Sequence, residues 1–276
     1  MKKSILITGC SSGIGHATAL ALFRAGYDVF ATARRPDDVL RLIEEGLNAH
    51  QLDVTDPDSI DAALKWVLEQ TGGTLYALFN NAGYGQPGAL EDVPTFALRE
   101  QFETNVLGLH ELTRRVLPIM LAQGYGRILQ HSSVLGLVSL RFRGAYNASK
   151  YAIEGLCDTL RLELEGTGVH VLTLNTGPIR SKFRDNAIRM FEKNIDTEQS
   201  RFAEVYEEEV YKRKQKKEEK DRFTRDADAV IAKVIMALEA KRPAPRYHIT
   251  GATQLLALFK RLLPTRGLDA LLRKIQ

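Results

Sequence analysis

The sequence is poor in cysteine and has no long apolar run. Cys10 and Cys157 are the only cysteines among 276 residues, which excludes a framework of disulfides and favours a reducing compartment. No stretch approaches the ~18 apolar residues that a helix needs to cross a bilayer. The apolar start at residues 5–7 is also shorter than the ~7–15 residues of an export signal. We therefore expect a cytoplasmic protein whose first apolar run is a β-strand.

The chain also lacks a large excess of one charge. The formal net charge is +4, and the segment from Gln254 to the end holds five basic residues and one acidic residue, so the remainder is almost neutral. The basic run Lys212–Lys217 is followed at once by Glu218 and Glu219, which favours a solvated helix or loop. The six histidines show no metal-ligand spacing. We therefore expect neither a nucleic-acid partner nor a metal.

Hydrophobic residues make up 44% of the chain, enough for one domain over residues 1–276. Short apolar runs alternate with longer helical patterns. The expected strands are Ile5–Thr8, Asp28–Ala33, Ala49–Leu52, Leu75–Asn80, Arg127–His131, Val169–Asn175 and Tyr247–Ile249. The expected helices cover residues 14–25, 37–46, 57–71, 95–123, 146–165 and 226–240. This alternation predicts an α/β fold: a doubly wound, Rossmann-like parallel sheet of about seven strands between two layers of helices.

A glycine-rich turn follows the first expected strand. Its spacing is G-x-x-x-G-x-G, and a helix rich in Ala and Leu comes next. Glycines at such a turn let the backbone approach a pyrophosphate, and the helix N-terminus attracts the negative charge. The predicted dinucleotide contacts are Gly9, Ser11, Ser12, Gly13, Ile14 and Gly15. Residues 9–13 also match G-x-S-x-G, the nucleophile elbow of α/β-hydrolases, but that elbow needs earlier strands for its oxyanion hole.

The end of the second strand predicts which dinucleotide binds. An NAD site usually places an acid about 20 residues past the glycines, whereas this sequence has Arg34 and Arg35 there. A guanidinium matches a 2′-phosphate in charge and forked geometry, so we favour NADP(H). The alternative is that both arginines are only solvated surface residues.

Two further strand ends carry candidate cofactor contacts. Asp53 and Val54 follow the third strand and suit a contact with adenine, unless Asp53 only closes a turn or caps a helix. Asn81, Ala82 and Gly83 follow the fourth strand, where small residues let the backbone approach the cofactor. Asn and Gly also dominate ordinary turns, which is the alternative for this segment.

A second group of residues predicts catalysis. Tyr146 and Lys150 stand four apart at the start of a helix and therefore share one face. We expect the ammonium to lower the phenol pKa, which makes Tyr146 a proton donor or acceptor near neutral pH. Ser133 follows the fifth strand and can hold a carbonyl oxygen beside the phenol. His131 adjoins Ser132, but a packed strand-end histidine is expected because consecutive strand residues point to opposite faces.

These motifs together make the sequence resemble the short-chain dehydrogenase/reductase family over about residues 3–185. The resemblance rests on Thr8-Gly9-x-x-x-Gly13-Ile14-Gly15, Asp53, Asn80-Asn81-Ala82-Gly83, Asn105, Ser133, Tyr146-x-x-x-Lys150 and Gly177-Pro178-Ile179. Within the family, the sequence looks most like the branch of 17β-hydroxysteroid and retinol dehydrogenases and related bacterial NADP-dependent aldehyde reductases.

The resemblance implies a role for each catalytic residue. Tyr146 is the general acid that donates a proton as hydride arrives from the nicotinamide. Lys150 binds the nicotinamide ribose, and Ser133 orients the carbonyl. Asn105 holds a water that connects Lys150 to solvent, unless it is a buried Asn that satisfies helix carbonyls.

The resemblance also implies that Pro178, Ile179 and Ser181 contact the cofactor near the nicotinamide. Two positions depart from the family's pattern. Thr176 stands where a proline usually precedes the glycine, and Ser181 stands where threonine is common. Serine keeps the hydroxyl, so we expect binding to survive, whereas Thr176 leaves the shape of the loop open.

The implied activity is NADP(H)-dependent reduction of a hydrophobic aldehyde or ketone to the alcohol. The alternative is a non-enzymatic NADP(H) sensor on the same fold. A variable substrate loop is expected at about residues 180–225. The apolar residues expected to line the pocket, some of which can equally be core, are Val134, Leu135, Leu137, Val138, Leu140, Phe142, Phe183, Met190 and Phe191.

Two apolar stripes remain. One, in an amphipathic tail at about residues 251–276, consists of Leu255, Leu256, Phe259, Leu262 and Leu263 with basic neighbours. We favour packing of the tail against its own domain over contact with a membrane surface. The other, on the helix of Tyr146, consists of Ile153, Leu156, Leu160 and Leu164. In the family this region often builds an interface between subunits, so we expect a homodimer or homotetramer.

Overall fold

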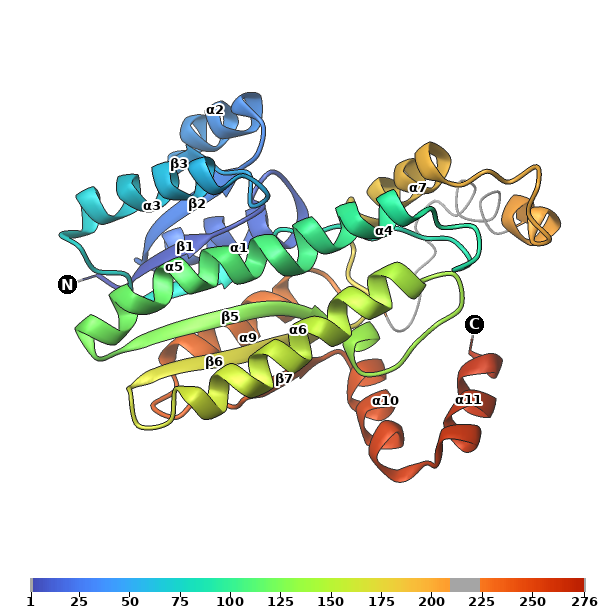
Figure 1. The fold of residues 1–276 in the computed structure, drawn as a ribbon. Helices are drawn as coiled ribbons and strands as arrows, with labels where there is room; N and C mark the ends of the chain where they lie inside the picture. Colours follow the sequence, from blue (N-terminus) through green and yellow to red (C-terminus); the bar gives the residue numbers. More distant parts are fainter. Residues whose placement is uncertain (1, 209–223, 276) are drawn as a thin grey trace.

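A seven-stranded parallel sheet forms the centre of the protein. The structure, a computed structural model, describes residues 2–208 and 224–275. The strands are β1 (Ser4–Ile7), β2 (Asp28–Ala33), β3 (Asn48–Gln51), β4 (Ala77–Asn80), β5 (Gly126–Ser133), β6 (Val169–Thr176) and β7 (Arg246–Ile249). They lie in the order β3-β2-β1-β4-β5-β6-β7, and each neighbouring pair is parallel (Figure 1). The predicted doubly wound fold is confirmed.

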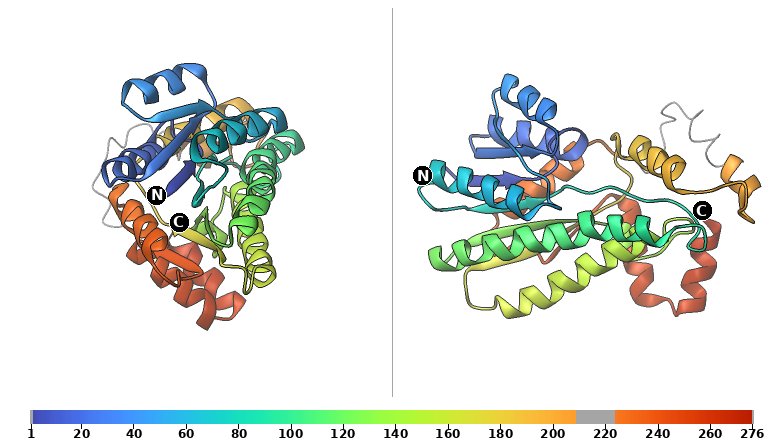
Figure 2. Two further views of the ribbon diagram at one scale, coloured as in Figure 1. Left: turned by 90° about the vertical axis from the view of Figure 1, so that its left-hand side faces the viewer. Right: turned by 45° about the horizontal axis from the view of Figure 1, so that its top comes forward.

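Helices cover both faces of the sheet because side chains alternate along its buried strands (Figures 1 and 2). In β1, Ile5 and Ile7 belong to one core and Leu6 belongs to the other. The first core includes residues of α1 (Gly13–Arg24), α2 (Pro36–Glu44) and α9 (Asp228–Glu239). The second includes residues of α3 (Pro57–Thr71), α5 (Gly108–Gln123) and α6 (Gly144–Glu163). The result is a three-layer arrangement.

Local sequence sets both ends of α3. The Asp56 side chain accepts a hydrogen bond from the Asp58 N–H at 3.0 Å, and Pro57 occupies the first helical position. Gly72 ends the helix in the left-handed conformation with φ +64°. The predicted bounds of this helix, 57–71, are confirmed.

The prediction of one continuous helix over 95–123 is wrong. The chain forms α4 (Thr95–Phe102), a π-helical segment η1 (Glu103–Leu107) and then α5. A Cβ on Gly108, where α5 begins, would overlap the carbonyl of Val54, so glycine allows the helix to approach the loop after β3 closely. The wider turn lies at Asn105, which is only 1% exposed. Such π-segments often occur at functional sites.

Among the described residues, three of the helices that follow β6 lie beyond the carboxyl ends of the strands, on the right in Figure 1. They are α7 (Phe183–Asn194), α10 (Gly251–Leu262) and α11 (Thr265–Lys274). The predicted variable loop therefore begins with a helix, while the charged run at 212–219 lies outside the described residues. Within residues 2–208 and 224–275, no helix is both long and apolar enough to cross a membrane.

The two C-terminal helices pack on the domain through one face. Leu268 and Leu272 are each 6% exposed and cluster with Val138, and Leu256, Phe259 and Leu263 lie against this cluster. The expected packing of the tail is confirmed. Leu255 and Leu262, which belong to the same predicted stripe, are nevertheless 50% and 68% exposed.

The apolar stripe on α6 is mostly core. Ile153 is fully buried, Leu164 is 7% exposed, and Leu160 packs against the same core. Only Leu156, at 40% exposure, offers substantial surface. The stripe faces the sheet because the helix must bury one side on it, so only Leu156 of its four residues is left for the expected contact between subunits.

Candidate active site

The glycine-rich turn leaves the sheet where its connections change direction. β1 lies between β2 and β4, and ligands of such sheets bind in the crevice at this switch point. Gly9 has a φ of +71°, and a Cβ there would lie 2.8 Å from the Cα of Ala82. A Cβ on Gly15 would overlap both the Asn81 side chain and the Gly9 carbonyl. The close approach of two strand ends therefore requires glycine at both positions.

Hydrogen bonds tie this turn to the end of β4. The Thr8 hydroxyl accepts from the N–H groups of Asn81 at 3.0 Å and Ala82 at 2.9 Å. Asn81 Nδ2 donates to the carbonyls of Thr8 and Gly9. The Ser12 side chain makes no hydrogen bond to cap α1, which leaves the first N–H groups of the helix available to an anion.

Arg34 and Arg35 lie beside the glycine turn, directly after β2. The Cys10 N–H bonds to the Thr32 carbonyl at 2.8 Å, which holds the turn against the end of this strand. Both arginines are exposed, and Arg35 pairs with Asp37 at 3.4 Å. The position is therefore electropositive and open to a ligand phosphate.

Arg41 is a further basic residue at this position, and the sequence analysis missed it. It extends from α2, donates from Nη2 to the Ser11 carbonyl, and pairs with Asp38 at 3.2 Å. No motif marks Arg41, because only the packing of α2 beside the glycine turn brings the two together.

Asp53 and Val54 are held in roles that do not require a ligand. Asp53 Oδ1 accepts from the N–H and the hydroxyl of Thr55 at 2.9 and 2.8 Å, so this carboxylate closes a turn. Val54 is 7% exposed and belongs to the second core. Their contact with adenine stays a prediction.

The predicted catalytic side chains meet at the carboxyl end of β5. Ser133 caps the 3-10 segment η2 (Val134–Gly136), and its Oγ accepts from the Leu135 N–H at 3.1 Å. Tyr146, at the start of α6, is close enough to interact with this side chain, and Ser133 Oγ donates to the Thr176 carbonyl at 3.4 Å. Lys150, one turn further along, places Nζ 5.5 Å from the centroid of the Tyr146 ring. A strand end and one helix face thus supply all three groups.

The phenol of Tyr146 does not titrate near neutral pH in this structure. Burial raises the pKa of Tyr146 to about 12, and the hydrogen bond with Ser133 opposes that rise. The prediction of a lowered pKa is wrong for the chain by itself, because removal from water disfavours the tyrosinate more strongly than the neighbouring groups favour it. Tyr146 therefore holds its proton at pH 7.

Lys150 is 5% exposed, and its Nζ donates to the carbonyl of His131 at 2.6 Å. Burial lowers the pKa of Lys150 to about 8, and the negative charge of Glu154 opposes this. His131 is packed at the end of β5, as expected: its ring nitrogens lie 2.9 Å from Asn81 Oδ1 and 3.2 Å from Thr176 Oγ1. Burial lowers the pKa of His131 to about 3, so the imidazole is neutral.

Asn105 fastens the backbone beside the catalytic helix. Its Oδ1 accepts from the Tyr84 N–H at 3.1 Å, and its Nδ2 donates to the Tyr84 carbonyl at 2.9 Å and to Ser149 Oγ at 3.2 Å. A Cβ on Gly83 would lie 3.0 Å from the Asn105 side chain. The amide thus bonds to the segment after β4 and to α6, not to carbonyls of its own helix, and the water contact stays a prediction.

The loop after β6 faces the glycine turn. A Cβ on Gly13 would lie 3.1 Å from the Cβ of Ser181, so the two segments border the same crevice. The Pro178 carbonyl accepts from the Arg225 N–H at 3.1 Å, and Ile179 packs against the first core. These contacts hold the loop in place at the switch point.

Aromatic side chains gather beside Tyr146. The ring centroid of Phe183, on α7, lies 5.4 Å from that of Tyr146. Phe191, Tyr206 and Ile195 form a buried cluster to which Phe142 packs. Of the predicted pocket residues, Phe142, Phe183 and Phe191 therefore belong to this aromatic side. Val134, Val138 and Leu140 instead pack with the C-terminal helices, as core.

The crevice suits the backbone of a dinucleotide. The space at Gly9 and Gly15 is too small for any side chain, and the first N–H groups of α1 can donate hydrogen bonds to a phosphate. Arg34 and Arg41 add positive charge at its edge, which matches a 2′-phosphate. These residues fit a nicotinamide dinucleotide. Among the described residues, no group of three His, Cys, Asp or Glu side chains could hold a metal ion.

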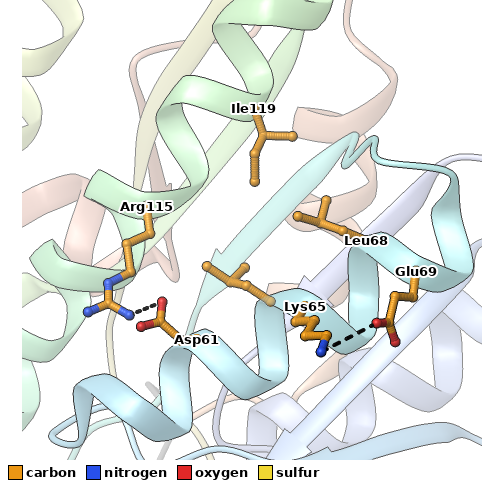
Figure 3. Close-up of a pocket in the computed structure, with 7 residues that line it drawn as sticks. Asp61, Lys65, Leu68, Glu69, Arg115 and Ile119 are labelled. Atoms are coloured by element: carbon orange, nitrogen blue, oxygen red, sulfur yellow. Dashed lines mark ion pairs between the residues drawn. The ribbon is translucent and has the colours of Figure 1, made fainter.

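A cleft of about 550 Å³ lies elsewhere, between α3 and α5 (Figure 3). Arg115 pairs there with Asp61, and Lys65 pairs with Glu69 at 3.9 Å. None of the predicted site residues lines this cleft, and its charged side chains are paired with one another. We therefore place the candidate site at the switch point of the sheet.

Known proteins resemble this chain over nearly its whole length. A family model described as short chain dehydrogenase matches residues 3–191. The oxidoreductase YbbO of Escherichia coli (strain K12) is 41% identical over 273 residues, which cover 99% of this chain and 95% of that protein. An NADPH-dependent 3-dehydrocapnine reductase of Ornithobacterium rhinotracheale is 31% identical, covering 98% and 95%. A solved short-chain dehydrogenase of Streptomyces avermitilis superposes with a TM-score of 0.78 at 31% identity, covering 94% and 91%.

Proposed function

The chain belongs to the short-chain dehydrogenase family of oxidoreductases, and from this premise we propose that it reduces a hydrophobic aldehyde or ketone to the alcohol with NADPH. The observation that carries the proposal is the meeting of Ser133, Tyr146 and Lys150 at the carboxyl end of β5. The three groups stand beside the crevice that fits a dinucleotide. A carbonyl held there meets hydrogen-bond donors on its oxygen.

Tyr146 is the proposed proton donor. A general acid must hold its proton until the reaction needs it, and a pKa near 12 ensures this at neutral pH. Because the side chains of Ser133 and Tyr146 are neighbours, a carbonyl oxygen placed against both hydroxyls accepts from both. The proton moves from Tyr146 Oη to that oxygen as the carbonyl carbon is reduced. When NADPH is bound in the crevice, the hydride for this carbon comes from its nicotinamide.

Lys150 supports the proton transfer through its position beside the phenol ring of Tyr146. Its ammonium lies 5.5 Å from the ring centroid, where a positive charge stabilises the phenolate that remains after the proton has left. We also assign to Lys150 the binding of the nicotinamide ribose. Asn105 and Ser149 hold the segment after β4 against the catalytic helix, which keeps this wall of the site rigid.

The preference for NADPH is supported by the basic residues at the end of β2. Arg34 and Arg35 stand where an NAD site usually has an acid. Arg41 adds a third guanidinium that already contacts the glycine turn. The relative from Ornithobacterium rhinotracheale is named as NADPH-dependent, in line with this proposal.

The preference for an apolar substrate is supported by the aromatic cluster. Phe183 packs against Tyr146, and Phe142, Phe191 and Phe202 belong to a second apolar cluster to which α7, the helix of Phe183, also contributes. Apolar walls around a few polar catalytic groups favour a bulky, uncharged carbonyl compound.

The test is NADPH oxidation with graded aldehydes and ketones by the Tyr146→Phe variant and a matched control. Tyr151→Phe is the control, since Tyr151 is on the same helix and its hydroxyl bonds the Leu137 carbonyl at 2.6 Å. We expect turnover to fall by about 10²-fold or more in Tyr146→Phe, while NADPH affinity and the control's turnover stay unchanged. Full turnover by Tyr146→Phe would show that the proton donor is another group. NADPH binding without turnover by the unaltered protein would favour the sensor.

We also infer a homodimer or homotetramer. Phe96, Leu107 and Leu156 are 52%, 49% and 40% exposed and lie on α4, η1 and α6, which pack side by side. Large exposed apolar side chains on neighbouring helices favour association. Light scattering on the purified protein checks this, and a monomer at micromolar concentration would refute it.

A further inference from the structure

A buried carboxylate lies one helical turn beyond Lys150. Glu154 is 6% exposed, yet its side chain is hydrogen-bonded to three polar groups from β6 and β7. It accepts from Asn175 Nδ2 at 2.6 Å, from Arg246 Nε at 2.9 Å and from the Thr173 hydroxyl at 3.3 Å. Such complete bonding indicates that Glu154 is held as a carboxylate in a defined orientation.

Charges of opposite sign alternate along this part of the molecule. Arg246 Nη2 also donates to both oxygens of Asp158, at 2.7 and 2.6 Å, so one guanidinium bridges two carboxylates. The Asp158 side chain is 43% exposed, whereas that of Glu154 is 8% exposed. Lys150 and Glu154 are therefore the deeply buried cation and anion of the array, four residues apart on one face of α6.

The surroundings of Lys150 offer its ammonium little other compensation. From β5 it meets the carbonyl of His131, whose imidazole is neutral. From α6 itself, Tyr146 is protonated at neutral pH. The carboxylates of α4 and η1, Glu100 and Glu103, are exposed to solvent. A buried ammonium without an opposite charge loses its proton easily.

The remaining titratable groups near Glu154 are on β7 and α6. His248 and Arg246 are on β7, and burial together with the positive charge of Arg246 lowers the pKa of His248, so it is neutral. Cys157 is protonated because burial raises the pKa of its thiol. Glu154 is thus the buried anion one helical turn from Lys150, and Arg246 is the cation that pairs with it.

We propose that Glu154 is a positioning residue of the active site, whose buried carboxylate, held by Arg246, is the counter-charge that keeps Lys150 an ammonium beneath Tyr146. A second contact points the same way: Asn175 Nδ2, which binds Glu154, also lies 3.5 Å from the carbonyl of Ser133. The carboxylate therefore acts on the site through Lys150 and through the backbone of Ser133. The effect of Glu154 on catalysis rests on the proposed function, whereas its effect on the protonation of Lys150 does not.

Two variants separate this electrostatic role from a merely structural one. Glu154→Gln removes the anion, so Lys150 should lose its proton more easily. Arg246→Gln removes the competing cation, so Lys150 should hold its proton more firmly. Both variants disturb the contact between Glu154 and Arg246, at 2.9 Å, so a loss of packing would affect both in the same direction. Glu163→Gln, an exposed acid on the same helix, is the matched control.

The experiment is a titration of Lys150 by NMR in protein labelled with ¹³C at lysine Cε, with the resonance assigned by Lys150→Arg. We expect the pKa of Lys150 to fall by about one unit in Glu154→Gln, to rise in Arg246→Gln and to stay unchanged in Glu163→Gln. An unchanged value in Glu154→Gln, or a fall in both variants, would overturn the proposal. Should Glu154→Gln not fold, Arg246→Gln decides alone, because only a rise agrees with the proposal.

The catalytic consequence is read separately, from the pH profile of NADPH oxidation. In Glu154→Gln the alkaline limb should move about one unit toward lower pH, with about fivefold less activity at pH 8 and little change at pH 6. Equal loss at both pH values would mean that Lys150 is not the link. Because the NMR titration needs no turnover, failure of the proposed function leaves the Glu154 inference testable, and the reverse also holds.

Discussion

Substitution of glycine by alanine should have opposite effects at two positions of this protein. Gly155 is exposed in the middle of α6, and a Cβ there meets nothing within 4 Å. Gly15 lies in the first turn of α1, and a Cβ there would overlap the Asn81 side chain and the Gly9 carbonyl. The same chemical change therefore tests whether the glycine turn is as tight as the crevice requires.

The magnitudes follow from helix propensity and packing. Alanine is favoured over glycine in a helix interior by about 0.8–1 kcal/mol, so Gly155→Ala should raise the melting temperature by about 2–4 °C. At Gly15 a similar gain is opposed by an overpacking cost of about 1–3 kcal/mol, because a carbonyl and a bonded amide cannot move aside freely. Gly15→Ala should therefore be destabilised by up to about 2 kcal/mol, with distortion of the glycine turn.

The assay is thermal unfolding with and without NADPH. At a ligand concentration 100 times Kd, binding stabilises the folded state by about 2.7 kcal/mol. Unaltered protein and Gly155→Ala should show this full increase, whereas Gly15→Ala should lose most of it. If Gly15→Ala melted higher than the unaltered protein and kept the NADPH effect, the glycine turn would not be the tight cofactor contact that we infer.

Three further outcomes are expected. Arg34→Ala should weaken NADPH binding by about 10- to 100-fold and leave NADH binding unchanged, because one charge-assisted contact with the 2′-phosphate is lost. Fluorescence titration with both nucleotides measures the two affinities, and equal losses for NADPH and NADH would contradict this role of Arg34. The folded-state pKa of His131, about 3, lies below the unfolded value of about 6.5, so the unfolded chain takes up the proton first as pH falls. The free energy of unfolding should therefore decline from pH 6.5 downward, and this group alone should account for a loss of about 2 kcal/mol at pH 5. Urea unfolding at pH 7 and pH 5 measures the difference, which should be smaller in His131→Gln. Leu272→Ala should cost about 2–4 kcal/mol and expose the C-terminal helices to limited proteolysis, whereas Leu262→Ala, at a position 68% exposed, should change neither.

Much of the fold could be predicted because its signals are local. The apolar strands bounded by turns and the cap formed by Asp56 and Pro57 each depend on a few consecutive residues. The motif at Tyr146 and Lys150 also needs only one helical turn to place both on one face. Several such motifs in one order carry the resemblance to the family, and that resemblance implies the roles of the individual residues, which no motif gives alone.

The errors and omissions all involve residues far apart in the chain. The π-segment at Asn105 interrupts what looks like one helix, because the side chain bonds Tyr84 and Ser149 from other elements. Arg41 joins the glycine turn only because α2 packs beside it. The stripe of Ile153 and Leu160 looks equally suitable for a subunit interface and for a core, and only the position of the sheet decides.

The sequence by itself therefore determined the kind of sheet, the glycine turn and which side chains we propose as reactive, because periodicity and short motifs act over one or two turns of chain. The tertiary structure decided the protonation of those side chains. Burial raises the pKa of Tyr146 and lowers that of Lys150, and the carboxylate that opposes the second shift is held by Arg246, 92 residues away. Desolvation and the field of distant charges depend on how the whole chain packs, and no local pattern contains them.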